Sequence, residues 1–279
     1  MKKGLTTLAG LSAAACALHG LTSLDFSNVV ETSPGSNVWN IDDIAETSAG
    51  SGIFVDARLT LTDQTGFVSQ LGVDNSANLP PEDINIFLER DNTGSTNSFD
   101  YYEFELSFWS DGNIGVVNQE VFANDFELVA YDLDSIPTID ETRDTVRVFD
   151  ATTVTIESGS PVDTDLFSGP PVNARATAGV IQLNPPPPAG GSGPISTDSD
   201  GVAQFGFDSA VASFTFQAGI SEALSGIENA SGTQRNIVFS GDASRFTFDN
   251  PDTLVVPEPA ALGGLFGIAA LLIARRRIA

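Results

Sequence analysis

The 279-residue chain has very few of the side chains on which most enzymes depend. Its single Cys, His and Met and both of its lysines all lie within residues 1–19, so 25–256 contain none of them. This absence excludes a Ser–His–Asp triad, a thiol nucleophile, a Schiff-base lysine and an ordinary zinc site from that region. The same region has no disulfide to stabilise it. We therefore expect a protein that is not an enzyme.

Basic residues are also scarce. Residues 18–256 carry 36 acidic side chains against seven arginines, a net charge of −29. Phosphate binding needs clustered Lys and Arg, so we expect no nucleic-acid partner. Cations, or polymers bridged by cations, are better suited to this charge.

The N-terminus has the order of a secretory signal peptide. Lys2 and Lys3 precede an apolar stretch over 4–18, and Ala15-Cys16-Ala17 offers a small-x-small cleavage site. We expect 1–24 to be a signal peptide and a short lead-in, and the protein to be exported. A lipoprotein site at Cys16 is the minor alternative, because Ala13 stands where a larger aliphatic residue is usual.

The C-terminus carries a second targeting pattern. Val256, Pro257, Glu258 and Pro259 precede an uncharged run over 260–274, which Arg275, Arg276 and Arg277 follow. As a helix, fifteen residues span roughly 22 Å, less than the ~30 Å hydrocarbon core, so the run is a marginal anchor. The arginines would stay on the cytoplasmic side and leave the body outside.

This arrangement resembles the PEP-CTERM sorting signal of exported bacterial proteins, here over 251–279. The resemblance implies an exosortase-type processing enzyme as a partner and a transient inner-membrane anchor through a helix over 260–274. It also implies a final location at the cell surface or outside the cell, in association with exopolysaccharide and biofilm. A simple one-pass anchor is the alternative that length and charge alone allow.

The region between the two ends has β signals almost throughout. Over 102–108, apolar residues at even positions alternate with polar residues at odd positions, which predicts a strand with one buried face. The same period recurs around Val146 and Val148, Phe205 and Phe207, Phe214 and Phe216, and Phe246 and Phe248. Further strand-like runs cover 52–61, 84–88, 126–131, 151–156, 176–182 and 236–240.

Many short, half-polar strands without intervening helices predict an all-β fold, an antiparallel β-sandwich of jelly-roll type over 25–250. Most phenylalanines then belong to the core. Short helices are expected near 40–47 and 220–226. The Pro- and Gly-rich stretch 184–200 is expected to be a long loop within one sandwich, although it could instead divide two β domains.

One acidic segment has the residue types of a calcium site. Asp132 and Asp134 follow a strand-like run, Asp140 and Glu141 lie in the next expected loop, and Asp144 opens the following strand. Oxygen ligands in a flexible loop suit Ca²⁺. These five residues are therefore a candidate calcium site, unless they only hydrogen-bond turn amides or pair with a neighbouring arginine.

Sugar binding would favour exposed aromatic rings. Trp109 lies at the end of a strand on the face opposite Phe108, so we expect it at the surface as a ligand platform, with a buried structural role as the alternative. Three functions remain open. The first is a structural or adhesive surface protein associated with polysaccharide, the second is a carbohydrate-binding module, and the third is a glycosidase that uses two carboxylates.

Overall fold

The computed structural model describes residues 18–65, 68–74, 80–90, 99–133, 135–136, 142–160, 162–167, 173–178, 201–222 and 234–256. Within these ranges the regular structure consists of strands and the short 3₁₀ helix η2 (Ala243–Arg245). No helix in the described ranges has the length and apolar character needed to cross a membrane. The predicted all-β fold is therefore confirmed.

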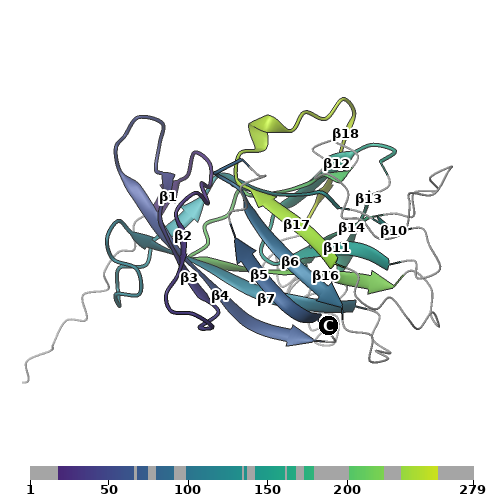
Figure 1. Cartoon of the computed structure of the whole chain (residues 1–279). Helices are drawn as coiled ribbons and strands as arrows, with labels where there is room; N and C mark the ends of the chain where they lie inside the picture. Colours follow the sequence, from purple (N-terminus) through teal and green to yellow (C-terminus); the bar gives the residue numbers. More distant parts are fainter. Residues whose placement is uncertain are drawn as a thin grey trace, which may run out of the picture.

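The strands form two large antiparallel sheets (Figure 1). In spatial order, the nine-stranded sheet contains β13 (Val162–Phe167), β14 (Asn173–Ala178), β11 (Thr142–Val148), β16 (Ser213–Glu222), β7 (Phe99–Ser110), β4 (Phe54–Thr65), β3 (Val38–Glu46) and β2 (Val29–Glu31), with β10 (Ser135–Ile136) also paired to β11. The seven-stranded sheet contains β18 (Pro251–Val255), β12 (Thr153–Glu157), β15 (Ala203–Phe207), β9 (Phe126–Tyr131), β17 (Gln234–Ser240), β6 (Ile84–Arg90) and β5 (Val68–Asp74). A separate parallel pair joins β1 (Leu18–Gly20) to β8 (Phe122–Asn124).

The core lies between the two sheets and is rich in phenylalanine. Along β7, the even-numbered residues from Asp100 to Phe108 are buried and most odd-numbered ones are partly exposed, as the period of two predicts. Phe216 of the nine-stranded sheet contacts Phe239 of the seven-stranded sheet, with ring centroids 4.9 Å apart. Phe214 likewise meets Phe207 at 4.6 Å. Contacts between rings of opposite sheets confirm the β-sandwich and the predicted role of the phenylalanines.

The parts of the chain before and after residues 184–200 belong to the same two sheets. β16 lies between β7 and β11, and β15 lies between β9 and β12. Strands on the two sides of the Pro- and Gly-rich stretch therefore complete one shared core. The stretch itself lies outside the described residues.

Three local predictions were wrong. The helix expected near 40–47 is strand β3, in which Trp39 and Ile41 face the core. The helix expected near 220–226 is, as far as Glu222, the end of β16, and 223–226 lie outside the described residues. The segment around Phe246 and Phe248, expected to be a strand, is irregular chain after η2. None of the strands that the structure describes pairs with its backbone, and both rings pack on the outer face of the seven-stranded sheet.

Both ends of the folded region reach beyond the expected boundaries at 25 and 250. Leu21 and Leu24 are 5% and 1% exposed and belong to the main core. At the other end, β18 pairs with β12, and Val256 is 5% exposed with its backbone N–H donating to Thr152 O at 2.8 Å. The folded region therefore includes Leu21 at one end and Val256 at the other.

A second, smaller apolar cluster covers the outer face of the seven-stranded sheet. It joins Val129, Tyr131, Val202 and Val238 of the sheet region to Phe246 of the segment after η2. A polar network holds this segment in place: Arg245 Nη1 contacts Asp83 Oδ1 at 2.7 Å, and the Tyr131 hydroxyl donates to Asp83 Oδ2. Burial and the Asp83 carboxylate raise the pKa of Tyr131 well above its usual range, so the hydroxyl remains a donor.

The Asp83 network predicts a graded loss of stability. Tyr131→Phe removes one hydrogen bond and should lower the free energy of unfolding by about 1 kcal/mol. Arg245→Met leaves the fully buried Asp83 carboxylate without its cation and should cost about 3 kcal/mol. Urea unfolding of the two variants measures both values. An Arg245→Met cost no larger than that of Tyr131→Phe would contradict this account.

Candidate functional site

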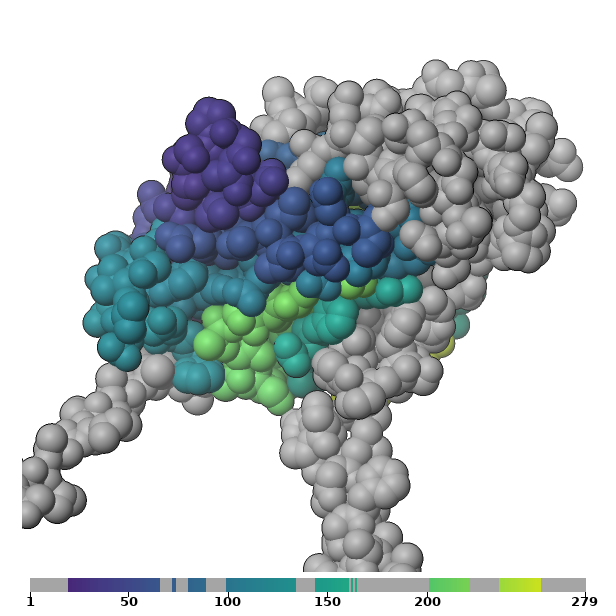
Figure 2. All heavy atoms as spheres, turned by 90° about the horizontal axis from the view of Figure 1, so that it is seen from below, coloured from purple at the N-terminus to yellow at the C-terminus, as the bar shows by residue number. Residues whose placement is uncertain are grey.

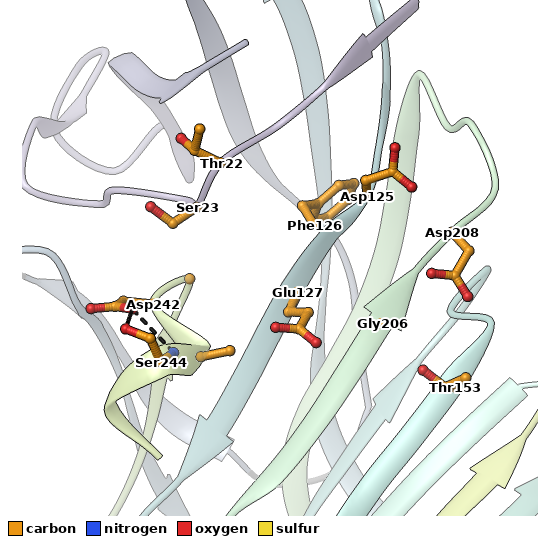
Figure 3. A pocket seen from close by; sticks show the side chains of 12 residues that line it. Thr22, Ser23, Asp125, Phe126, Glu127, Thr153, Gly206, Asp208, Asp242 and Ser244 are labelled. Atoms are coloured by element: carbon orange, nitrogen blue, oxygen red, sulfur yellow. Dashed lines mark hydrogen bonds between the residues drawn. The ribbon is translucent and has the colours of Figure 1, made fainter. Parts of the chain in front are cut away.

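A groove of about 480 Å³ opens on the outer face of the seven-stranded sheet. It lies where β9, β12 and β15 meet the N-terminal segment and the residues around η2 (Figure 3). Its lining residues are Thr22, Ser23, Asp125, Phe126, Glu127, Thr153, Gly206, Asp208, Gly241, Asp242, Ala243 and Ser244.

The floor of the groove is formed by the outward positions of three neighbouring strands. Leu128, Phe205 and Val154 point into the core, so the adjacent Glu127, Gly206 and Thr153 face outward. A Cβ at position 206 would lie 2.5 Å from Thr153 Oγ1. Any other residue at 206 would therefore force the Thr153 side chain to move, and glycine keeps the floor free of a side chain at that point.

The walls come from segments that are far apart in the sequence. On one side, Thr22 donates from Oγ1 to Glu46 O at 3.2 Å, and Asp242 caps η2 by accepting from Ser244 N at 3.1 Å. On the other side stand Asp125 and Asp208. In Figure 3, Glu127 lies between the Asp242–Ser244 side and the side that carries Asp208 and Thr153.

The groove is acidic. Four carboxylates line it, at Asp125, Glu127, Asp208 and Asp242, and none of its lining residues is Lys, Arg or His. Hydroxyls from Thr and Ser supply the remaining side-chain polarity, and the ring of Phe126 is only 2% exposed. A ligand for this groove must therefore donate hydrogen bonds or carry positive charge.

Hydrogen bonds orient these carboxylates and leave acceptor capacity. Glu127 Oε1 accepts from Gln204 Nε2, Asp208 Oδ2 accepts from Thr152 Oγ1 at 3.1 Å, and Asn124 Nδ2 donates to Asp125 Oδ2. Within the described residues, each of these contacts uses one oxygen of its carboxylate. The second oxygen of each group is left for a ligand or solvent.

The sequence did not single out these residues. Alternation predicts that Glu127 and Thr153 face outward, but it does not indicate that the segments at 22–23, 206–208 and 241–244 lie next to them. Their proximity depends on the strand order β12-β15-β9-β17, in which sequence neighbours are not spatial neighbours. The glycine at 206 between Phe205 and Phe207 is the one local signal of a close approach.

The five residues of the predicted calcium site fall partly outside the described ranges. Asp134, Asp140 and Glu141 are among the residues that the structure does not describe. Asp132 follows β9 of the seven-stranded sheet and is 8% exposed, whereas Asp144 lies in β11 of the nine-stranded sheet and is 1% exposed. The calcium site over this segment stays a prediction.

A different acidic cluster lies at the edge between β3, β4 and the turn after β7. Carboxylate oxygens of Asp43, Asp56 and Asp111 lie within 4.8 Å of one another. Asp56 is 3% exposed and accepts from the N–H groups of Asp43 at 2.9 Å and Gly112 at 2.7 Å. Oxygen ligands suit Ca²⁺, so these three residues could hold a divalent cation. They are too far apart in the sequence to be recognised as a motif.

Electrostatic repulsion in this cluster can be tested at Asp43. Burial, followed by the charges of Asp111, Asp56 and Asp42, raises the pKa of Asp43. A raised folded-state pKa means that ionisation disfavours the fold, so stability is lost as the pH rises through that pKa. Asp43 also has a positive φ of 55°, which asparagine tolerates equally well.

We therefore expect Asp43→Asn to stabilise the protein at pH 7 in the presence of a chelator, by no more than about 1 kcal/mol because exposed charges are screened. The gain should shrink at low pH, where Asp43 is already neutral. Thermal melting at several pH values measures it. Asp252→Asn, at an exposed position of β18 in the other sheet, is the control, and a loss of stability for Asp43→Asn at pH 7 would refute the repulsion.

Trp109 does not lie at the surface as expected. It is 9% exposed, and the Arg58 guanidinium lies 5.4 Å from its ring centroid. Its backbone also pairs with Glu120 in an isolated antiparallel β-bridge. It belongs to the outer face of the nine-stranded sheet, where β4 (blue), β7 and β16 (green) run side by side in Figure 2. Polar side chains on this face bond to one another, for example Gln217 Nε2 to Glu103 Oε2 at 2.8 Å.

The remaining predicted site residues concern sorting. Val256 is the end of the described chain, and it packs in the core. Pro257, Glu258, Pro259 and the three arginines at 275–277 lie outside the described residues, as does the apolar run 260–274.

No protein-family model and no curated protein matches the chain. Among solved structures, the chain is similar to the glucan binding protein C of Streptococcus mutans, which is described as mediating sucrose-independent and sucrose-dependent adherence. The two are 15% identical, with a TM-score of 0.39, over 80% of this chain and 62% of the other. The chain thus spans less than two thirds of that protein.

Proposed function

We propose that this chain is an exported, non-catalytic β-sandwich that attaches to extracellular polysaccharide at the cell surface. The observation that carries the proposal is the groove of about 480 Å³ with four carboxylates, hydroxyl side chains and no cationic side chain in its lining. Such a lining accepts hydrogen bonds from the many hydroxyls of a glycan. A structural adhesive and a carbohydrate-binding module would use the same groove.

The sorting part of the proposal rests on the two ends of the sequence. The small-x-small site at 15–17 precedes Leu18, where β1 begins, so cleavage there would leave the described fold intact. The Pro257-Glu258-Pro259 motif follows directly after Val256, the last described core residue. An exosortase-type enzyme and the inner membrane are the partners that this motif implies, and release to the surface is the expected outcome.

Replacement of Pro257, Glu258 and Pro259 by alanine tests sorting. In a host with an exosortase, we expect the variant to accumulate in the inner membrane while the parent protein reaches the surface or medium. Both proteins should begin at Leu18 when the N-terminus is sequenced. A triple alanine substitution at 190–192 is the control, and unchanged release of the 257–259 variant would contradict the sorting proposal.

Glycan attachment is tested by co-sedimentation with insoluble polysaccharides of neutral, N-acetylated, free-amino and uronic acid types. We expect at least one type to retain the protein, and Glu127→Gln to weaken that retention about tenfold, since it removes the central charge of the groove. Glu105→Gln is the matched control: Glu105 is also partly exposed on a strand and accepts one bond, from Ser107 Oγ at 2.8 Å, but it lies on the other sheet.

The same samples separate attachment from hydrolysis. A glycosidase would release soluble reducing ends through a pair of carboxylates, and this release would fall with Glu127→Gln or Asp208→Asn. The proposal predicts no release by the parent protein. Retention that is equal for the parent protein and Glu127→Gln on every polysaccharide would show that the groove is not the attachment site.

A further inference from the structure

We infer that the groove recognises a glycan that carries free ammonium groups, meaning a polysaccharide of amino sugars whose amines are not acetylated. This inference rests on the proposed function and narrows it to one class of glycan. The charged side chains that line the groove are all negative. Asp125, Glu127, Asp208 and Asp242 line one groove, and no lining residue can neutralise them.

The lining of the groove offers no exposed aromatic ring. Neutral sugars are often held by stacking on exposed aromatic side chains, because their hydroxyls exchange hydrogen bonds with water at little net gain. The one ring in the groove, Phe126, is 2% exposed and stacks on Phe207 in the core at 4.5 Å. Both tryptophans are also buried, at 6% for Trp39 and 9% for Trp109. Affinity in this groove must therefore come from charge and hydrogen bonds.

The carboxylates lie on the floor and on both walls of the groove. Glu127 occupies the centre of the floor, with Asp242 on one wall and Asp208 on the other (Figure 3). Gln204 and Thr152 hold one oxygen of Glu127 and one of Asp208, so each carboxylate keeps an oxygen for a ligand. An ammonium group makes charge-assisted hydrogen bonds to such oxygens, which are about twice as strong as neutral ones.

The remaining lining suits the rest of an amino sugar. Thr22, Ser23, Thr153 and Ser244 place hydroxyls around the groove. The hydroxyls of Thr22 and Ser244 donate within the protein, to Glu46 O and Asp242 Oδ1, so they can accept from a sugar hydroxyl. Those of Ser23 and Thr153 can donate or accept. A uronic acid glycan would instead bring like charges together in a protein whose net charge is −29 over 18–256, so it should be excluded.

Isothermal titration with the full folded protein tests the inference. The probes are a glucosamine oligomer and its N-acetylated counterpart of equal length, in a chelating buffer at about pH 6 and about pH 9. The free amine is largely protonated in the first buffer and largely neutral in the second. We expect the free-amine oligomer to bind at least tenfold more tightly than the N-acetylated one at pH 6, and to lose this advantage at pH 9 or in high salt.

Variants locate the binding. Glu127→Gln and Asp208→Asn should each weaken binding of the free-amine oligomer about tenfold, and the matched control Glu105→Gln should leave it unchanged. Thermal melting of each variant checks that the fold persists. Weakening by Glu105→Gln equal to that by Glu127→Gln would mean nonspecific attraction to an acidic protein, and it would overturn the inference.

The outcomes distinguish the inference from the proposed function. Equal binding of both oligomers with loss in Glu127→Gln would overturn the preference for amines but keep the groove as a glycan site. No binding of either oligomer, together with no retention on any polysaccharide, would overturn both. If spermidine or a lysine oligomer binds as tightly as the glucosamine oligomer, the groove recognises amines but not the sugar, and the assignment of a glycan ligand is wrong.

Discussion

The contact between phenylalanine rings of opposite sheets is the interaction on which the rest of the structure depends. Phe216 meets Phe239, and Phe214 meets Phe207, across the space between the sheets. The chain has no cysteine after residue 16, so no disulfide can replace this packing in the described fold. Each fully buried phenylalanine contributes on the order of 2 kcal/mol, which must offset the repulsion among 36 acidic side chains.

The groove follows from this arrangement. Once Leu128 and Phe205 point into the core, the alternation of a strand places Glu127 and Gly206 on the outer face of the seven-stranded sheet. The segment around η2 then covers part of that face, where Phe246 packs on Tyr131 and Arg245 binds the buried Asp83. What remains uncovered is bordered by Asp242 and Ser244 on the η2 side and is acidic. The core therefore determines the floor, and the Asp83 network holds one wall.

The sequence predicted the fold class and much of the strand content, because a period of two is a local property that β7 displays clearly. The predicted helix at 40–47 was wrong, because β3 has a shift of register between Ile41 and Ala45 that disturbs the alternation. The predicted strand at Phe246 was wrong because its ring packs in the second, smaller apolar cluster on the outer face of the seven-stranded sheet. The groove and the Asp43–Asp56–Asp111 cluster depend on long-range strand order, which no short spacing of residues encodes. Trp109 was placed on the correct face, but its burial depends on tertiary contacts such as that with the Arg58 guanidinium.

The most direct measurement of the central claim is the backbone amide NMR spectrum of the folded protein during titration with a glucosamine oligomer. The account predicts that the largest chemical-shift changes occur at Glu127, Gly206 and the residues 241–244, which border one groove but lie far apart in the sequence. Changes centred on the outer face of the nine-stranded sheet, around Glu103 and Glu105, would contradict it. So would small changes spread evenly over the acidic surface, because they would indicate charge attraction without a site.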